Sequence, residues 1–129
     1  DASAALRIDV LSFGFKHGSP RDADLVFDVR FLPIPHWVEH LRPYSGRDTR
    51  VRDYVFGQPA AGPFMEALTH LLDIVVPGYV KEGKRYLTIA IGCTGGKHRS
   101  VAIGDAIGEH LRTTTRLPVT VHHRDLGFE

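Results

Sequence analysis

Hydrophobic and polar positions alternate along the chain in a way that predicts four strands. From Leu6 to Phe15 the residues first alternate and then become mostly apolar, which is typical of a strand entering a core. Ala23 to Leu32 has a β-rich composition, and Leu117 to His122 predicts the last strand. Leu87 to Ile91 is a short apolar run with several β-branched residues, the kind of strand that is covered on both faces in a parallel sheet.

Two longer stretches have helical spacing instead. Pro63 stands where the first residue of a helix is expected, and a stripe of apolar residues follows it. These residues are Phe64, Ala67, Leu68, Leu71, Leu72 and Val75. Pro77-Gly78 is expected to break or kink this helix, and Val101 to Leu111 predicts another one. The order of elements predicts an α/β domain with three layers and a mostly parallel sheet.

Ligands of such sheets bind beyond the carboxyl ends of the strands. Four segments are expected to meet there, each at the end of a predicted strand. They are Phe15 to Gly18, Asp28 to Phe31, Gly92 to Ser100, and His122 to Arg124. The third of these segments carries most of the candidate chemistry.

That third segment is rich in glycine and in hydrogen-bond donors. Gly92, Gly95 and Gly96 allow tight turns that bring backbone N–H groups close to a ligand. A helix that starts directly after such a turn adds unpaired N–H groups and the positive end of its dipole. The side chains that could contact the same ligand are those of Cys93, Thr94, Lys97, His98, Arg99 and Ser100. The pattern predicts an anion site, most simply one for phosphate.

Of two known phosphate-binding motifs, this segment fails one and satisfies the other. A Walker A loop would need glycine and then Ser or Thr where the chain has Ile91 and His98, so ATP binding through this loop is not expected. Cys93, Arg99 and Ser100 do satisfy the short pattern of cysteine-dependent phosphatases, in which a thiolate attacks phosphorus. A structural glycine-rich turn around a small buried thiol is a third interpretation.

Charged residues near the ends of the first two strands extend the candidate site. Lys16 and His17 could reach a ligand if their strand neighbours the glycine-rich segment, and otherwise lie in a solvated turn. Asp28 and Arg30 are two positions apart and hence on one face of the second strand. They are interpreted as site residues, with a structural ion pair as the alternative.

The residues from His36 to His40 spell the inverted zinc-protease motif H-x-x-E-H. That motif needs a long helix, whereas the prolines around it leave room only for a short one, and no companion motif follows. We therefore expect no metal. His36 is interpreted instead as a residue of the anion site, next to Trp37.

Composition narrows the function classes. The 129 residues are 43% hydrophobic and 24% charged, as in ordinary globular domains, and a net charge of +1 provides no general basic field. A single cysteine allows no internal disulfide and is compatible with the cytoplasm. No apolar run approaches membrane-spanning length, so no membrane partner is expected. Because the sequence lacks an initiating Met, we expect it to be one domain of a longer protein.

Contact with nucleic acid would depend on local arginine patches. The candidates are Arg42, Arg47, Arg50, Arg52, Arg112, Arg116 and Arg124. Acidic residues lie among these arginines and few aromatic residues accompany them, so we expect weak, salt-dependent binding of structured RNA. Solvated surface is the alternative.

Several motifs together resemble a known family. They are Ser-Phe-Gly-Phe-Lys at 12–16, Asp-Ala-Asp at 22–24, Phe-Asp-Val-Arg-Phe-Leu-Pro at 27–33, Pro-His-Trp at 35–37, Leu-Arg-Pro at 41–43 and Ala-Ile-Gly-Cys-Thr-Gly-Gly-Lys-His-Arg-Ser-Val at 90–101. The chain thereby resembles the C-terminal domain of the RapZ family of bacterial RNase adapters, also called the YvcJ family of nucleotide-binding proteins. The resemblance covers nearly the whole chain, and its longest block is highly specific.

This resemblance implies a non-enzymatic regulatory domain whose fold resembles part of a phosphofructokinase. It also implies self-association, no cofactor in this domain, and a P-loop domain for ATP or GTP elsewhere in the longer protein. The best-known member of the family binds small regulatory RNAs, presents them to an RNase and senses glucosamine-6-phosphate. By resemblance the sugar-phosphate pocket would be lined by Lys16, His17, Asp28, Arg30, His36, Thr94, Gly95, Gly96, His98 and Arg99.

The C-terminus departs from the RNA-binding member of that family, which ends in a cluster of Lys and Arg. This chain ends Arg124-Asp-Leu-Gly-Phe-Glu129, which is nearly neutral. RNA binding and the RNase partnership are therefore weaker expectations than phosphosugar binding. A cysteine-dependent phosphatase stays open as the alternative function.

Overall fold

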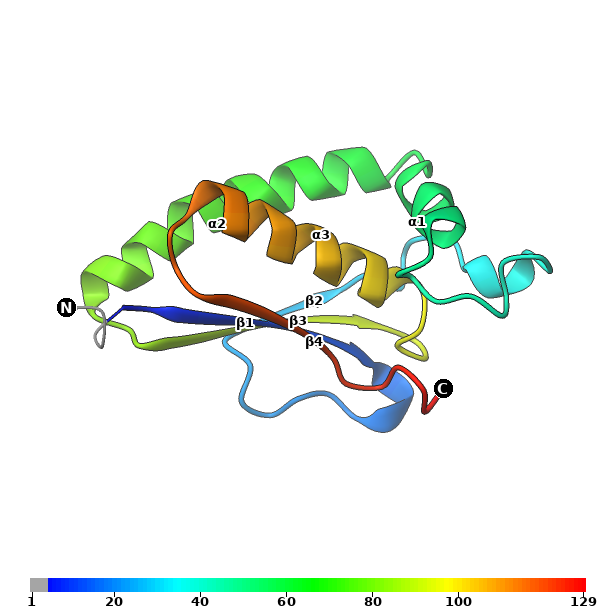
Figure 1. The fold of residues 1–129 in the computed structure, drawn as a ribbon, viewed down its shortest axis with the longest axis horizontal. Coiled ribbons are helices and arrows are strands. Elements are labelled where there is room, and N and C mark those ends of the chain that lie inside the picture. The colour runs from blue at the N-terminus through cyan, green and yellow to red at the C-terminus, as the bar shows by residue number, and fades with distance from the viewer. Residues whose placement is uncertain (1–4) are drawn as a thin grey trace.

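The computed structural model describes residues 5–129, and a sheet of four parallel strands lies at its centre (Figure 1). The strands are β1 (Arg7–Gly14), β2 (Leu25–Asp28), β3 (Tyr86–Cys93) and β4 (Val119–His123). They lie in the order β2-β3-β1-β4, and β1 pairs with β3 over its full length. The predictions of the α/β class and of a parallel sheet are confirmed.

Three α-helices lie on one side of this sheet (Figure 1). They are α1 (Thr49–Phe56), α2 (Ala61–Glu82) and α3 (Arg99–Thr114). The other side carries the segment that connects β1 to β2, which begins with the short 3-10 helix η2 (Phe15–His17). A second 3-10 helix, η3 (Pro35–Trp37), follows β2. Helical crossovers keep neighbouring strands parallel, because a tight hairpin can join only antiparallel strands.

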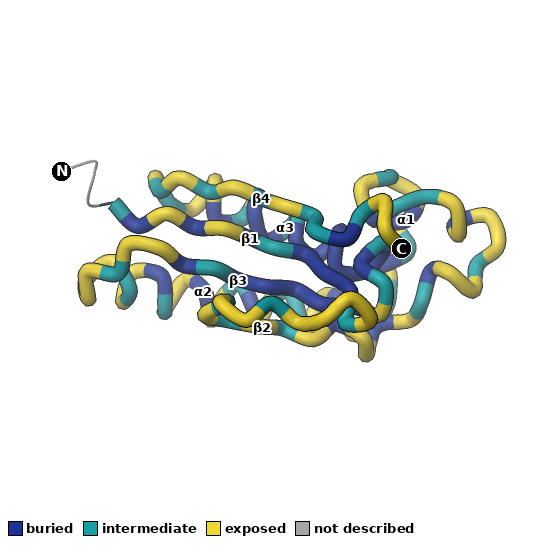
Figure 2. The backbone as a smooth tube through the Cα atoms, turned by 90° about the horizontal axis from the view of Figure 1, so that it is seen from below, coloured by how far each residue is buried: buried dark blue, intermediate teal, exposed yellow. Residues whose placement is uncertain are grey.

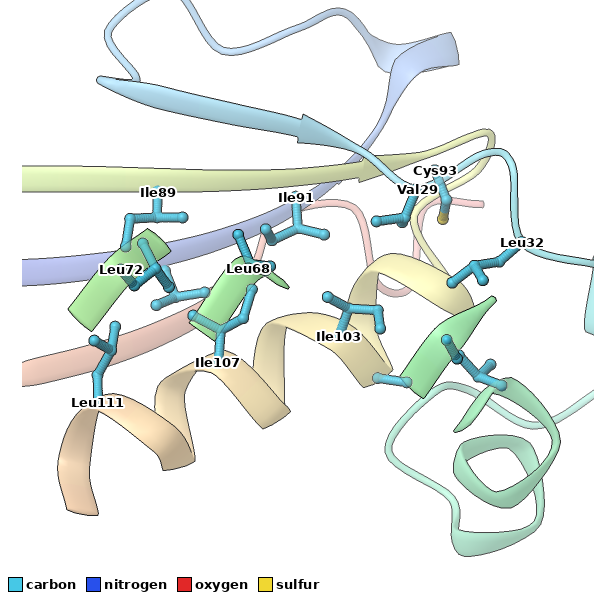
Figure 3. Packing of buried hydrophobic residues seen from close by; sticks show 14 of the residues in the cluster. Val29, Leu32, Leu68, Leu72, Ile89, Ile91, Cys93, Ile103, Ile107 and Leu111 are labelled. Atoms are coloured by element: carbon cyan, nitrogen blue, oxygen red, sulfur yellow. The ribbon is translucent and has the colours of Figure 1, made fainter. Parts of the chain in front are cut away.

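The core lies between the sheet and the helices α2 and α3 (Figure 3). Ile89 and Ile91 point from β3 toward Leu68 and Leu72 of α2 and toward the apolar face of α3. That face of α3 consists of Ile103, Ile107 and Leu111. Seen from below, β1 and β3 contain more buried residues than the outer strands β2 and β4 (Figure 2). The two central strands are therefore the best protected part of the fold.

The helix α1 begins among the candidate arginines at positions 42–52, a stretch for which the sequence predicted no helix. Asp48 is its N-cap and accepts a hydrogen bond from the Arg50 backbone N–H at 2.9 Å. The Arg50 side chain also binds this carboxylate and lowers the pKa of Asp48 to about 2. Val51 and Val55 lie one turn apart and are fully buried. A capping residue before two apolar residues at this spacing is the signal that the prediction missed.

Two other element boundaries differ from the predictions. β2 ends at Asp28, because this side chain accepts a hydrogen bond from the Arg30 backbone N–H and turns the chain out of the sheet. α2 continues through Pro77 and ends only at Gly83, whose φ of +90° is the left-handed conformation of a helix C-terminus. Leu72 and Val76, which pack in the core before that proline, hold the helix against the sheet. Within the described part of the chain, none of the helices combines the length and apolar character needed to cross a membrane.

The end of β1 lies so close to the loop after β3 that only glycine fits at position 14. A side-chain carbon there would overlap the Gly95 backbone and lie 2.8 Å from the Gly96 nitrogen. We therefore expect Gly14→Ala to lower the free energy of unfolding by about 1 to 3 kcal/mol, the scale for overpacking a tight site. Urea unfolding measures this change.

Gly62→Ala is the matched control for this substitution. Gly62 lies in α2, and no atom lies within 4 Å of the position that a side-chain carbon would take. Alanine there should be neutral or stabilise the protein by up to about 1 kcal/mol. If Gly14→Ala were as stable as Gly62→Ala, the close approach would not constrain the fold.

Candidate functional site

The carboxyl ends of the strands lie along one edge of the sheet, and hydrogen bonds join the segments that leave it. The Lys16 backbone N–H donates to the carbonyl oxygen of Thr94 at 3.1 Å. The Val29 N–H donates to the carbonyl of Gly92 at 2.9 Å, which ties the end of β2 to β3. Asp125, just after β4, accepts a hydrogen bond of 2.7 Å from the Gly14 backbone N–H. The four predicted strand ends are thus neighbours in space.

A pocket of about 410 Å³ opens at this edge. Its lining residues are Lys16, Ile34, His36, Trp37, Cys93, Thr94, Gly95, Lys97, His98, Arg99 and Glu129. Eight of these were candidate site residues from the sequence. They come from η2, from η3, and from the stretch between the last residue of β3 and the first residue of α3. The start of α3 faces this loop, and the first backbone N–H groups of a helix have no partner within it.

Five predicted residues do not line the pocket. His17 is exposed on η2, and Gly96 adopts a φ of +82° that glycine tolerates best. Ser100 is fully buried, and its hydroxyl accepts a hydrogen bond from the Cys93 thiol at 3.0 Å. The other two, Asp28 and Arg30, bind each other. A role in ligand binding stays a prediction for all five.

Asp28 and Arg30 form the ion pair that was the alternative interpretation of their spacing. The Arg30 Nη2 lies 2.6 Å from Asp28 Oδ2, and its Nε donates to the same carboxylate. Hydrogen bonding to Arg30 is the main reason that the pKa of Asp28 lies below its usual value. The Arg30 guanidinium also lies over the Phe15 ring, 3.8 Å from the centroid. The pair keeps Asp28 ionised at neutral pH.

Arg99 is almost wholly buried and holds two loops together. Its Nη1 donates to the carbonyl oxygens of Arg30 and Leu32, both at 2.9 Å. Its Nη2 donates to the Thr94 hydroxyl at 3.2 Å. Burial lowers the pKa of Arg99, although nearby Cys93 acts in the opposite direction. The guanidinium stays charged in proteins, so these acceptors compensate a buried cation and fix the segment after β2 to the glycine-rich loop.

His98 has a side-chain nitrogen without a partner in the described part of the chain. Only 7% of the residue is exposed, and its Nε2 has no hydrogen bond there. Burial lowers the pKa of His98 below its usual value, while backbone groups of Arg42 and Tyr44 act in the opposite direction. A buried polar atom without a partner is costly. His98 lines the pocket through other atoms, because its Nε2 is itself closed off from solvent.

Lys16, Lys97 and Glu129 bring charges of both signs to the pocket. The Lys16 Nζ donates to the backbone carbonyl oxygen of Glu129 at 3.0 Å. The Lys97 Nζ donates to the carbonyl of Arg42 at 3.0 Å and lies 4.0 Å from a carboxylate oxygen of Glu129. The ammonium groups favour an anion, and the carboxylate opposes one.

A second hydrogen-bonded group lies beside the same edge. The Ser12 hydroxyl lies 2.6 Å from Nδ1 of His123, whose Nε2 lies 2.9 Å from Asp105 Oδ1. Ser12 is fully buried and does not line the pocket, so a substrate would not reach its hydroxyl. The hydrogen bonds among these side chains join β1, β4 and α3. The group differs from a catalytic triad, whose nucleophile must be accessible to substrate.

The H-x-x-E-H motif does not form the helix that a zinc protease requires. The 3-10 helix η3 ends at Trp37, and the rest of the motif is irregular. Among residues 5–129 there is no group of His, Cys, Asp and Glu side chains arranged to hold a metal ion. His36 instead lines the pocket, and its role in anion binding stays a prediction.

The seven candidate arginines for RNA are divided between the two ends of α3. Arg112 and Arg116 lie at its C-terminal end, whereas the arginines at 42, 47, 50 and 52 lie near its first turn, where Gly46 donates to the Lys97 carbonyl. Since a helix of 16 residues is about 24 Å long, they form no single patch. Arg50, Arg47 and Arg124 are also paired with Asp48, Asp105 and Asp125.

Three pocket residues were not predicted as ligand residues: Ile34, Trp37 and Glu129. Trp37 had a signal in the sequence, because it follows His36 in a segment restricted by prolines. Its ring lies edge-on to the His36 ring with centroids 5.7 Å apart. Glu129 had no such signal, because the turn at Asp125 brings it to the pocket and that turn depends on Gly14.

Comparison with known proteins agrees with this architecture. The family model of the RapZ C-terminal domain matches residues 6–127. The chain belongs to the RapZ C-terminal domain family. A nucleotide-binding protein of Mycobacterium avium is 60% identical over 131 residues, which cover 99% of this chain and 44% of that relative. A nucleotide-binding protein of Mycobacterium ulcerans is 59% identical, and the match covers 100% of this chain and 42% of that relative. One of Acidothermus cellulolyticus is 56% identical, and the match covers 100% of this chain and 43% of that relative. This RapZ C-terminal domain therefore spans less than half the length of these relatives.

The burial of His98 predicts that the stability of the domain depends on pH. The pKa of His98 in the folded state lies below the value of about 6.5 expected in the unfolded chain. As the pH falls below about 6.5, the unfolded chain takes up this proton first, so the free energy of unfolding decreases until the pH reaches the folded-state pKa. Urea unfolding at about pH 7.5 and 5.5 measures the loss.

The variant His98→Gln should lose less stability over this pH interval than the parent. His40→Gln, at an exposed position, is the control and should keep the dependence of the parent. An unchanged dependence in His98→Gln would assign the effect to other groups.

Glu129 provides a separate test of the pocket electrostatics. Replacing its carboxylate by an amide in Glu129→Gln removes negative charge beside Lys97. We expect inorganic phosphate to bind this variant more tightly by a factor of about two to five, the range for a partly exposed charge pair. Calorimetric titration gives the ratio. Equal or weaker phosphate binding by Glu129→Gln would mean that the anion binds away from this carboxylate.

Proposed function

We propose that this domain binds a phosphorylated small metabolite in the pocket at the carboxyl edge of the sheet. The observation that carries the proposal is the convergence of Lys16, Lys97 and the start of α3 on one pocket. Ammonium groups and the N-terminus of a helix are groups with which proteins bind phosphate.

Within this class the ligand is a phosphorylated amino sugar of the glucosamine-6-phosphate kind. The resemblance of the glycine-rich segment to the RapZ family supports this choice. The charges of the pocket are compatible with it, because Lys16 and Lys97 suit the phosphate and the Glu129 carboxylate suits an ammonium group. The pocket thus offers complementary charge to both ends of such a molecule.

The domain acts as a regulatory module and not as an enzyme. In a cysteine-dependent phosphatase an arginine holds the phosphate oxygens and an acid protonates the leaving group. Here the Arg99 guanidinium binds backbone carbonyls, and Asp28 is held ionised by Arg30. Cys93 is only 2% exposed. These features favour binding over phosphoryl transfer.

The resemblance to the RapZ family is the basis on which we propose partners for the longer protein. We propose that a cytoplasmic protein carries this domain together with a P-loop domain for ATP or GTP, in keeping with the name of the relatives as nucleotide-binding proteins. Small regulatory RNA and an RNase are its proposed partners. Because the arginines of this domain are dispersed, its RNA affinity would depend on self-association, which combines weak sites.

Calorimetry with glucosamine-6-phosphate tests the binding proposal. Lys16→Met and Lys97→Met should each weaken binding by about 1 to 2 kcal/mol, toward the lower end for charged hydrogen bonds because both groups are partly exposed. Lys81→Met, at an exposed position outside the pocket, should bind like the parent. Absence of binding by the parent, or equal binding by all variants, would refute the proposal.

The non-catalytic role has its own test. The parent and Cys93→Ser should both leave an aryl phosphate unhydrolysed under conditions in which the parent binds glucosamine-6-phosphate. Turnover by the parent that disappears in Cys93→Ser would make this domain a phosphatase.

A further inference from the structure

Trp37 is the one tryptophan of the sequence, and 74% of it is exposed although it lines the pocket. Burying a large apolar side chain stabilises a protein, and Trp37 forgoes most of this contribution. Its indole lies in the same pocket as the ammonium groups of Lys16 and Lys97. An aromatic face beside an anion site is suited to a ligand that carries a ring as well as a phosphate.

The backbone around Trp37 is held in place. Its backbone N–H donates to the carbonyl oxygen of Ile34 at 3.2 Å, and the N–H of Val38 donates to the carbonyl oxygen of Pro35 at 2.9 Å. The Arg42 side chain donates to the His36 carbonyl at 2.8 Å, and Lys97 donates to the carbonyl of Arg42 at 3.0 Å. Two successive hydrogen bonds thus connect the turn that carries the indole to the loop of the anion site. The backbone that carries the indole therefore needs little ordering when a ligand arrives.

The volume of the pocket points the same way. The pocket has a volume of about 410 Å³. A single water takes up about 30 Å³, and an inorganic phosphate is only a few times larger, so it would fill a small part of this volume. The remaining wall includes Ile34 and Trp37, which offer no charge to a phosphate oxygen. The pocket is therefore larger and more apolar than an orthophosphate site requires.

We propose that Trp37 stacks on the sugar or nucleobase ring of a phosphate monoester and so selects ring-bearing ligands over open-chain phosphates. This inference rests on the proposed function, because it places the phosphate at Lys16 and Lys97 and adds a second contact. A sugar ring would present its C–H face to the indole, and a nucleobase would present its π face. Either contact adds area and stacking energy that inorganic phosphate and glycerol phosphate lack.

The test uses the 129-residue chain and the fluorescence of its single tryptophan. Glucosamine-6-phosphate, a nucleoside monophosphate, glycerol phosphate and inorganic phosphate are titrated separately. A ring-bearing phosphate should shift the Trp37 emission and bind at least about tenfold more tightly than glycerol phosphate, the ratio expected from one stacking contact. Whether the sugar or the nucleotide causes the shift decides which kind of ring is selected.

Calorimetry on two variants separates stacking from general binding. Trp37→Ala should lose about tenfold in affinity for the ring-bearing ligand and stay within about twofold for inorganic phosphate, while Trp37→Phe should recover most of the loss. Because Trp37 is exposed, both variants should unfold at the urea midpoint of the parent. Lys16→Met should weaken the binding of both the ring-bearing ligand and inorganic phosphate.

Each outcome of this test decides the inference. Equal affinity of Trp37→Ala and the parent for every phosphate would overturn stacking and leave the proposed function standing. A loss for inorganic phosphate as large as for the ring-bearing ligand would also overturn it, because Trp37 would then support the anion site itself. Failure of the parent to bind any of the four phosphates would overturn both proposals.

Discussion

The pairing of β1 with β3 determines where the pocket forms. The two strands run parallel and in register, so that Gly14 and Cys93 lie opposite each other at their ends. The segments that follow both strands must leave the sheet at the same edge. The hydrogen bond between the backbones of Lys16 and Thr94 shows how closely these segments run. Lys16 and Lys97 lie some eighty residues apart in sequence, and this register brings both to one pocket.

A buried cation underneath the pocket gives its wall a fixed shape. Arg99 is 3% exposed and uses its guanidinium to bind carbonyl oxygens of the chain after β2. A charged group in such a place is stable only with acceptors around it, and once they are engaged it has less capacity for a ligand. The partly exposed ammonium groups of Lys16 and Lys97 are then the stronger candidates for contact with phosphate. Arg99 would support binding mainly by holding the loops in place.

The pocket combines kinds of surface that a simple phosphate site does not need. Besides the lysines it has the exposed indole of Trp37 and the carboxylate of Glu129. These come from η3 and from the turn after β4, which reach the pocket through separate hydrogen bonds to Arg42 and to Gly14. A ligand that satisfies all of them carries an anionic group, a ring and a cationic group, which is the chemistry of a phosphorylated amino sugar.

The sequence alone determined the strands, the glycine-rich loop and the helix after it, because the spacing of apolar residues and the backbone freedom of glycine are local properties. It also placed seven of the eight predicted pocket residues at strand ends, all except His36. Tertiary structure decided whether each of these side chains was free. Arg99 found acceptors in the segment after β2, and Glu129 reached the pocket through the turn in which Asp125 binds Gly14. Such pairings depend on distances across the fold, which residue spacing along one strand or helix does not specify.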